Sequence, residues 1–276
     1  NSFPNTPAVS ITQPTCTLST GTITVAAQGI GETYSFDNGS NFQSENSKSG
    51  LAAGSYDIII KSSGGCISPT TSITIKSATN VWNGSVWSNG SVPISTENIE
   101  FAGNYSSSSD LSGCSCKVTA GAVVINSPHT LTITNAVSVL GGSLTFKHDL
   151  NVPSNSASLV QKNNVTNSGN IIYERMTNTL VRNTDYTYWS SPVSSQTLYN
   201  LSPFTLSGML YSYEVTATSE DWNQEIGATT MAVGKGYAVR GPENKGLNLF
   251  LASFNGVPNN GSYALTGIFA DKSYLL

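Results

Sequence analysis

Charged side chains are scarce in this sequence. Only 10% of its 276 residues are Asp, Glu, Lys or Arg, and the formal net charge is −4. The 12 basic residues are spread along the chain and form no stripe of the kind that follows a phosphate backbone. We therefore expect no binding to nucleic acid.

Long hydrophobic runs are also missing. Apolar runs such as Ile58 to Ile60 and the interrupted stretch Leu247 to Phe254 are far shorter than the roughly 20 residues of a membrane helix. The sequence predicts no membrane span. No charged-then-apolar leader opens the chain, so either a signal was removed or the chain is an internal fragment of a longer protein. We expect the fragment, because Asn1 to Pro7 is typical of an inter-domain linker.

Histidine occurs only twice, as His129 beside a proline and His148 between Lys147 and Asp149. Nucleophilic catalysis needs a positioned base with a partner, and neither histidine has one at a recognisable spacing. We expect both to be ordinary surface residues.

Paired carboxylates could cleave sugars, and β-solenoids can host such sites. The candidates are Glu97, Glu100, Asp110 and Asp149, but their spacing brings no two of them together. The sequence therefore predicts no catalytic residues, and we expect a protein that is not an enzyme.

The four cysteines divide into a distant pair and a close pair. A disulfide between Cys16 and Cys66 would close a loop of about 50 residues and stabilise the fold by about 4 kcal/mol; the alternative is two unpaired buried thiols. Cys114 and Cys116 would point to the same face of a strand. They could be buried neighbours, a local disulfide or two metal ligands, and burial is favoured because only two histidines could complete a zinc site.

Hydroxyl and amide side chains are abundant instead, because Ser, Thr and Asn make up roughly a third of the chain, with 25 Gly and 11 Pro. These residues favour turns and half-exposed strands over helices. The sequence predicts an all-β protein with three regions.

The first region, residues 1–78, contains short strands separated by turn residues. Gly50 to Cys66 is its clearest element: Tyr56, Ile58 and Ile60 alternate with Ser55, Asp57 and Lys61, and the run ends at a glycine turn, which is the pattern of a half-buried strand. Such strands predict an immunoglobulin-like sandwich. The candidates are Val9 to Ile11, Thr22 to Ala26, Thr33 to Phe36, Tyr56 to Lys61 and Thr71 to Ile75.

The second region, residues 79–175, opens with Trp-Asn-Gly and continues as many short β runs. Comparable positions recur every dozen to eighteen residues, which predicts the rungs of a β-solenoid; a second sandwich is the alternative. The runs are Ile99 to Phe101, Lys117 to Val118, Val123 to Ile125, Leu131 to Ile133, Val137 to Leu140, Leu144 to Phe146, Leu159 to Val160 and Ile171 to Tyr173.

The third region, residues 176–276, is rich in aromatic side chains and alternating strands, which predicts a β-sandwich, jelly-roll-like. Exposed aromatic rings are typical of carbohydrate-binding faces, and aromatic residues concentrate here at Tyr186, Tyr188, Trp189, Tyr211, Tyr213 and Trp222. We assign Tyr186, Tyr188, Trp189 and Trp222 as candidates. Core packing is the alternative. Tyr186 and Tyr188 share one strand face and Trp189 takes the other, so at least one set should be buried.

No cofactor is expected. Calcium has weak support from Asp37 with Asn38 and from Asp221 with Asn223, whose side chains could offer oxygen ligands. The competing interpretation, Asx turns, is favoured because no full ligand pattern is present.

The order of motifs in the first region resembles the repeat of giant cell-surface adhesins of Bacteroidetes, of which the gliding-motility adhesins are the best-known members. It departs from the common pattern mainly in the charged stretch at Lys48. The motifs are QPTC at Gln13 to Cys16, GTITV at Gly21 to Val25, YSFDNGSNFQ at Tyr34 to Gln43, GLAAGSY at Gly50 to Tyr56, GGC at Gly64 to Cys66 and TSITI at Thr71 to Ile75.

The second and third regions resemble domains that follow one another in the same proteins, where the chain continues past a strand like Ser273 to Leu276. We therefore expect the third region to be incomplete at its C-terminus. The resemblance implies export by the type IX secretion system, anchoring at the outer surface of the bacterium, and a role in attachment or gliding. The expected partners are other domains of the same chain, the secretion and anchoring machinery, and surface polysaccharide. A carbohydrate-binding accessory region of a secreted polysaccharide-degrading enzyme is the alternative.

Overall fold

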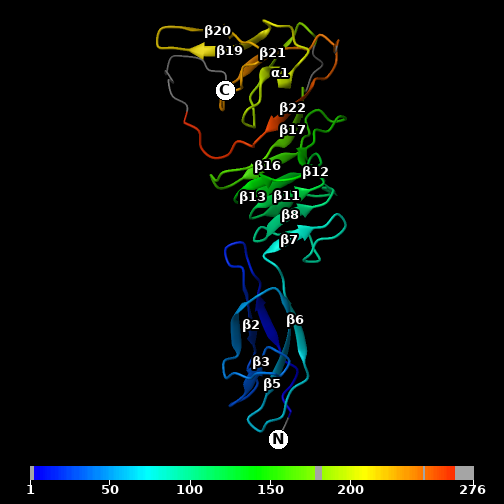
Figure 1. The fold of residues 1–276 in the computed structure, drawn as a ribbon, viewed down its shortest axis with the longest axis vertical. Coiled ribbons are helices and arrows are strands. Elements are labelled where there is room, and N and C mark those ends of the chain that lie inside the picture. The colour runs from blue at the N-terminus through cyan, green and yellow to red at the C-terminus, as the bar shows by residue number, and fades with distance from the viewer. Residues whose placement is uncertain (1–2, 178–181, 245, 265–276) are drawn as a thin grey trace. The chain divides into compact units, whose positions relative to one another are not determined.

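The computed structural model describes residues 3–177, 182–244 and 246–264, and their regular structure is almost entirely β (Figure 1). The one helix among these residues, α1 (Leu198–Leu201), has four residues. The predicted all-β class is therefore confirmed. In this part of the chain, no helix has the length and apolar character needed to cross a membrane. The strand expected at Ser273 to Leu276 lies outside the described residues.

The chain divides into two compact units. One consists of Asn1–Asn80 with Trp87–Asn98, and the other of Val81–Val86 with Ile99–Leu276. The sequence-based division into residues 1–78, 79–175 and 176–276 stays a prediction.

The first unit is an immunoglobulin-like sandwich of two three-stranded antiparallel sheets. Ile58 and Ile60 are fully buried in its core, as predicted from Gly50 to Cys66. Ile59 between them is also buried, so the alternation does not continue through these three residues. One sheet has the order β1 (Val9–Thr12), β2 (Gly21–Val25), β4 (Ser47–Leu51), and the other β3 (Thr33–Ser35), β5 (Gly54–Lys61), β6 (Thr71–Ile75).

The predicted disulfide between Cys16 and Cys66 is wrong. Cys16 is disulfide-bonded, but Cys66 carries a free thiol. Different segments position the two cysteines. Cys66 lies in the turn after β5, where its N–H donates to the Ser62 hydroxyl oxygen, whereas the N–H of Cys16 donates to the carbonyl of Thr96.

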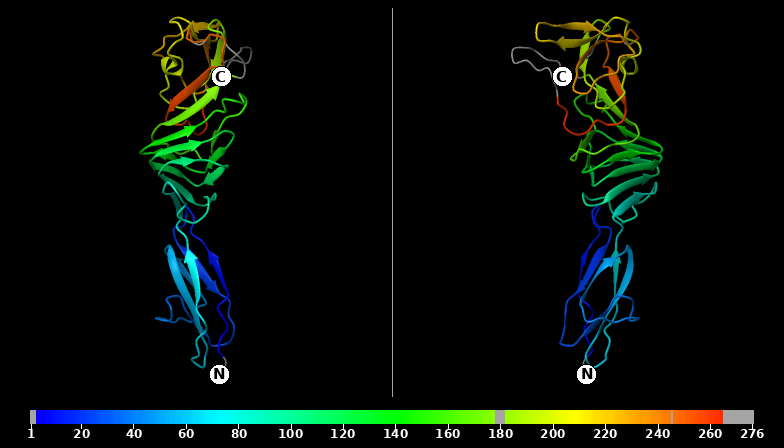
Figure 2. Two further views of the ribbon diagram at one scale, coloured as in Figure 1. Left: turned by 90° about the vertical axis from the view of Figure 1, so that its right-hand side faces the viewer. Right: turned by 60° about the vertical axis from the view of Figure 1, so that its left-hand side comes forward.

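The second unit begins with a parallel β-solenoid, which confirms the predicted rungs. Three turns stack with their strands in parallel register, as Figure 2 shows. The first turn has β8 (Asn98–Ala102), β9 (Tyr105–Ser106) and β10 (Leu111–Gly113), with β7 (Thr79–Trp82) beside β8. The second has β11 (Cys116–Ala120), β12 (Ala122–Ile125) and β13 (Thr130–Ile133), and the third β14 (Val137–Val139), β15 (Ser143–Phe146) and β16 (Ser158–Gln161).

Buried side chains form ladders inside the solenoid. Cys116 is paired with Ile99 on one side and Val137 on the other, and all three are buried. Burial raises the pKa of the Cys116 thiol to about 12. Cys114 is also buried and is disulfide-bonded, while Cys116 is free, so the two do not form a local disulfide. Both side chains are buried, as favoured for this pair, but a disulfide from Cys114 to a cysteine outside the pair was not among the expected alternatives.

At one corner of the solenoid, successive turns are in direct backbone contact, and glycines occupy the contact positions. A Cβ on Gly121 would meet the carbonyl carbon of Gly103, and one on Gly142 would meet the carbonyl oxygen of Gly121. Gly121 also has a φ of +84°, a conformation that disfavours side chains. The turns can therefore approach this closely only without side chains at the corner.

The aromatic region is an insertion in a long hairpin that ends the solenoid. β17 (Ile171–Met176) continues the sheet of β15 in parallel, and β22 (Leu251–Gly256) pairs antiparallel with β17. The intervening chain forms a four-stranded antiparallel sheet in the order β18 (Tyr186–Trp189), β21 (Tyr237–Arg240), β19 (Leu210–Val215), β20 (Glu220–Gln224). Trp189 packs its ring edge-to-face on Phe250 and Phe254, so the sheet and the hairpin form two layers.

Alanine substitutions at the corner should separate backbone strain from collision. Gly121→Ala combines a positive φ with overlap onto Gly103, so we expect it to lower the free energy of unfolding by about 3 kcal/mol or more. Gly84→Ala has a positive φ but only ordinary contact at 3.9 Å, so about 1–2 kcal/mol is expected. Denaturant unfolding would measure both. Equal losses in the two variants would contradict the close-contact account.

Candidate functional site

The register of the four-stranded sheet places aromatic side chains on one of its faces. Tyr188 is paired with Ala238, and Ala238 is paired on its other side with Tyr211. Tyr186 lies two residues before Tyr188 on the same strand face, and Trp222 on β20 pairs with Tyr213 two residues beyond Tyr211. Because strand side chains alternate between faces, all of these residues project from the same side of the sheet.

Ala238 creates a hollow at the centre of this face. Its methyl group stands between larger rings from three strands, and the resulting cavity has a volume of about 410 Å³. The cavity is lined by Tyr186, Tyr188, Tyr211, Trp222 and Ala238, and we call these five residues the aromatic hollow.

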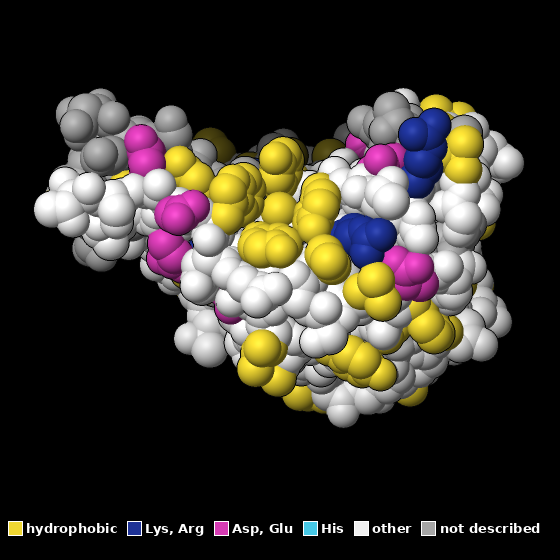
Figure 3. Space-filling view, turned by 90° about the horizontal axis from the view of Figure 1, so that it is seen from above, with side chains coloured by type: hydrophobic (Ala, Val, Ile, Leu, Met, Phe, Trp, Pro, Cys, Tyr) yellow, Lys and Arg dark blue, Asp and Glu magenta, His cyan; other side chains and the backbone are white. Residues whose placement is uncertain are grey.

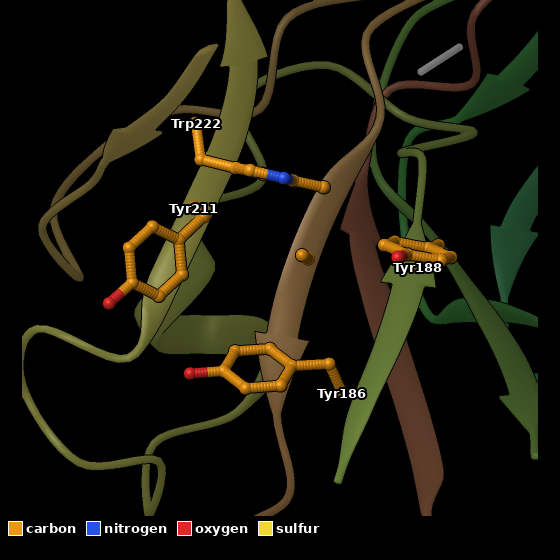
Figure 4. Close-up of a pocket in the computed structure, with 5 residues that line it drawn as sticks. Tyr186, Tyr188, Tyr211 and Trp222 are labelled. Atoms are coloured by element: carbon orange, nitrogen blue, oxygen red, sulfur yellow. The ribbon is translucent and has the colours of Figure 1, made fainter.

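The rings of the aromatic hollow form two pairs. Tyr188 and Trp222 have nearly parallel planes, 9° apart, with centroids separated by 6.2 Å. Tyr186 and Tyr211 meet at 60° with centroids 6.0 Å apart. Figure 4 shows Tyr188 and Trp222 edge-on and the rings of Tyr186 and Tyr211 turned toward the viewer. The parallel pair therefore stands up from the sheet beside a lower pair.

These rings remain accessible to solvent. Tyr188 is 61% exposed, Trp222 44% and Tyr186 42%. Grouped aromatic rings with this exposure are typical of a binding surface, since a folded chain otherwise buries large apolar side chains together.

Trp189 does not belong to the aromatic hollow, which corrects its assignment as a glycan-binding candidate. It follows Tyr188 on β18 and so projects from the opposite face of the sheet, where it packs against Phe250 and Phe254. Its indole nitrogen is buried and has no hydrogen-bond partner among the described residues. Tyr186 and Tyr188 were expected on one face of the strand and Trp189 on the other, and the structure has this arrangement.

Ala238 was missed as a site residue, and Tyr211 was noted among the aromatic residues of the third region but not assigned as a candidate. The alternation in Leu210 to Glu214 indicates that Tyr211 and Tyr213 share a face, but it does not indicate which strand lies next to theirs. The order of the sheet, in which β21 separates β18 from β19, brings Tyr211 to Tyr188 across Ala238.

Charged groups flank the aromatic hollow. Glu220 lies two residues before Trp222 on β20, and desolvation, followed by the nearby Glu220 carboxylate, raises the pKa of Tyr213. Arg240, paired with Tyr186 across strands, forms an ion pair with Glu243 at 3.3 Å. Figure 3, seen from the end that carries β19 and β20, shows hydrophobic side chains clustered with acidic and basic groups beside them.

The four carboxylates considered for catalysis lie in separate hydrogen-bond sets. Glu97 accepts bonds from Asn80, Asn89 and the N–H of Ile94. The remaining three have other partners: Glu100 pairs with Lys117 at 3.5 Å, Asp110 accepts from the N–H of Thr130, and Asp149 accepts from the N–H groups of Asn151 and Val152. Each of these carboxylates therefore holds a nearby segment or the next turn of the solenoid in place.

The two weak calcium candidates have local hydrogen bonds. Asp37 accepts bonds from the side-chain amide and the backbone N–H of Asn41 and from the Ser35 hydroxyl. These bonds lower the pKa of Asp37 to about 2. Asp221 accepts a bond from the N–H of Trp222. In the part of the chain that the structure describes, no three His, Cys, Asp or Glu side chains cluster in a way that could hold a metal ion.

His148 is buried, so the expectation that it lies at the surface is wrong. It is 7% exposed, and among the described residues its ring nitrogens make no hydrogen bond of normal geometry. Burial, followed by the Arg175 guanidinium, lowers its pKa and outweighs the opposing effects of Pro153, Asp149 and Glu174. His129 is half-buried and has a partner, since its Nδ1 lies 2.8 Å from the Ser107 hydroxyl oxygen.

The fold and the site define an all-β protein in which a parallel solenoid carries a sheet with an exposed aromatic hollow. Residues 74–272 match the model of a family described as a domain of unknown function, DUF8693, and the chain belongs to this family. No curated protein matches the chain.

The buried ring of His148 should make stability depend on pH. Because its pKa is lowered in the folded state, the unfolded chain binds the proton more readily, and stability should fall as the pH drops below about 6.5. We expect His148→Phe to lose less stability than the native chain between pH 8 and pH 5. Urea unfolding at both pH values would measure this, and identical losses in the two proteins would contradict it.

Proposed function

We propose that this chain is a non-catalytic, adhesive segment of a large secreted bacterial surface protein, and that the aromatic hollow binds carbohydrate. The observation that carries this proposal is the set of exposed rings around Ala238. Sugar rings present C–H groups on their faces, and these groups stack favourably on aromatic rings while the sugar hydroxyls remain near water.

The other two parts of the chain support a role in spacing and display. The immunoglobulin-like sandwich and the parallel solenoid both have continuous buried cores. A solenoid of this kind stacks repeats in one direction and places whatever follows its last turn at its end. Here the aromatic sheet is inserted in the hairpin that follows the third turn.

The wider setting follows from the resemblance of the first region to Bacteroidetes adhesin repeats. On that basis we propose export by the type IX secretion system, location at the outer surface of the bacterium, and a role in attachment or gliding. Other domains of the same chain and the anchoring machinery would be its partners, and surface polysaccharide would be its ligand.

The aromatic hollow also suits a second function, as the carbohydrate-binding part of a secreted polysaccharide-degrading enzyme. The two functions share the ligand and differ in what the rest of the protein contains. A catalytic domain in the full gene would favour the enzyme, and further copies of the first region would favour the adhesin.

A glycan array tests the proposed binding directly. The native chain should bind at least one glycan saturably, and Trp222→Ala should weaken that binding at least tenfold, because it removes one of the two parallel rings. Ala238→Leu should also abolish binding, because it fills the hollow while all four rings remain.

Tyr199→Ala is the matched control, since Tyr199 is 58% exposed on α1 and lies outside the hollow. This variant should bind like the native chain. Silence of the native chain on the whole array, or equal binding by the Trp222→Ala and Tyr199→Ala variants, would refute the proposal.

A further inference from the structure

We infer that the aromatic hollow holds a stretch of flat, uncharged, β-1,4-linked polysaccharide, with two consecutive sugars on its two parallel rings. This inference rests on the proposed function and narrows it to one class of ligand. It excludes a single terminal sugar, a coiled glycan and a polyanionic glycan as the preferred ligand.

The parallel pair of rings argues for a flat chain. Tyr188 and Trp222 have planes 9° apart and centroids 6.2 Å apart, and Figure 4 shows the two rings edge-on and displaced sideways from each other. Two sugars stacked on the same side of these rings must therefore have nearly parallel planes. Equatorial β-1,4 linkages keep consecutive pyranose rings in this relation and give a ribbon. An α-1,4 linkage turns each ring relative to the last, so a coiled chain could stack on one ring of the pair but not on both.

The two parallel rings come from different strands, which favours a ligand of several sugars over a single sugar. Tyr188 is on β18 and Trp222 on β20, which are the two ends of the sheet order, and they converge above Ala238 on β21. Both rings keep a large exposed fraction in this position. One sugar can cover one ring, so the second ring contributes only when the ligand continues to a neighbouring sugar.

The lower pair supports the same orientation. Tyr186 and Tyr211 lie at 60° to each other beside the parallel pair, and Tyr186 donates its hydroxyl hydrogen to Met209 at 3.4 Å. A ribbon stacked on Tyr188 and Trp222 would rest one edge on these two rings.

The surrounding charge argues for an uncharged ligand. Glu220 shares the face with Trp222, and Arg240, which projects from that face beside Tyr186, forms an ion pair with Glu243. Residues 182–264 contain six acidic and four basic side chains. Glu220 would repel a polysaccharide that carries carboxylates or sulfates. Arg240 would not offset this repulsion, because its charge is already paired with Glu243.

Isothermal titration with matched oligosaccharides tests each part of this inference. Glucose to cellohexaose and mannose to mannohexaose give length series of flat neutral chains. Maltohexaose differs from cellohexaose only in linkage. The β-1,4-linked hexamer of mannuronate differs from β-1,4-linked mannohexaose only at C6, where a charged carboxylate replaces each hydroxymethyl group.

We expect the affinity in at least one neutral β-1,4 series to rise tenfold or more between the monosaccharide and the tetrasaccharide. Maltohexaose and the mannuronate hexamer should bind at least tenfold more weakly than their neutral β-1,4 counterparts. Tyr188→Ala and Trp222→Ala should each remove most of the gain with length, and Tyr199→Ala should leave it unchanged.

The inference is overturned if the monosaccharide binds as tightly as the hexasaccharide, or if maltohexaose or the mannuronate hexamer binds at least as well as its neutral counterpart. It is also overturned if neither neutral series binds. Saturable binding of another glycan that is lost in Trp222→Ala would then leave the proposed function standing, whereas silence toward all glycans would refute both.

Discussion

Direct contact between backbones at the glycine corner is the constraint on which the second unit depends. Gly103, Gly121 and Gly142 let successive turns approach closely enough for parallel strands to share hydrogen bonds. That stacking sets the position of β17, and β17 in turn sets the position of β22. Phe254 on β22 then contacts Trp189, whose strand carries Tyr186 and Tyr188 on its other face. The aromatic hollow is thus connected to the solenoid core through one series of packed residues.

The fold class could be predicted because it depends on short-range patterns. Alternation in Tyr56 to Lys61 identified a strand with buried Ile58 and Ile60, and the recurrence of short apolar runs identified the solenoid. Alternation of side chains within one strand also placed Tyr188 and Trp189 correctly on opposite faces. These patterns arise within one strand, so no knowledge of neighbouring strands was needed.

The completed site could not be predicted because it depends on pairing between distant strands. Tyr211 and Ala238 enter the hollow only because β21 lies between β18 and β19. The same limit explains two errors. Cys66 has a free thiol although Cys16, its predicted partner, is disulfide-bonded, and His148 is buried although polar residues flank it in the sequence. Each outcome is decided by tertiary packing that the sequence pattern does not contain.

The hairpin of β17 and β22 has a consequence for how this architecture can vary. Met176 and Leu251 are paired across the hairpin, and next to them the N–H of Thr177 donates to the carbonyl of Phe250 at 3.0 Å. The aromatic sheet therefore leaves the solenoid and returns to it at one place. A segment whose two ends are neighbours can be replaced without moving the strands that hold it. The solenoid can thus be kept as a constant scaffold while the segment between Thr177 and Phe250 is exchanged for another.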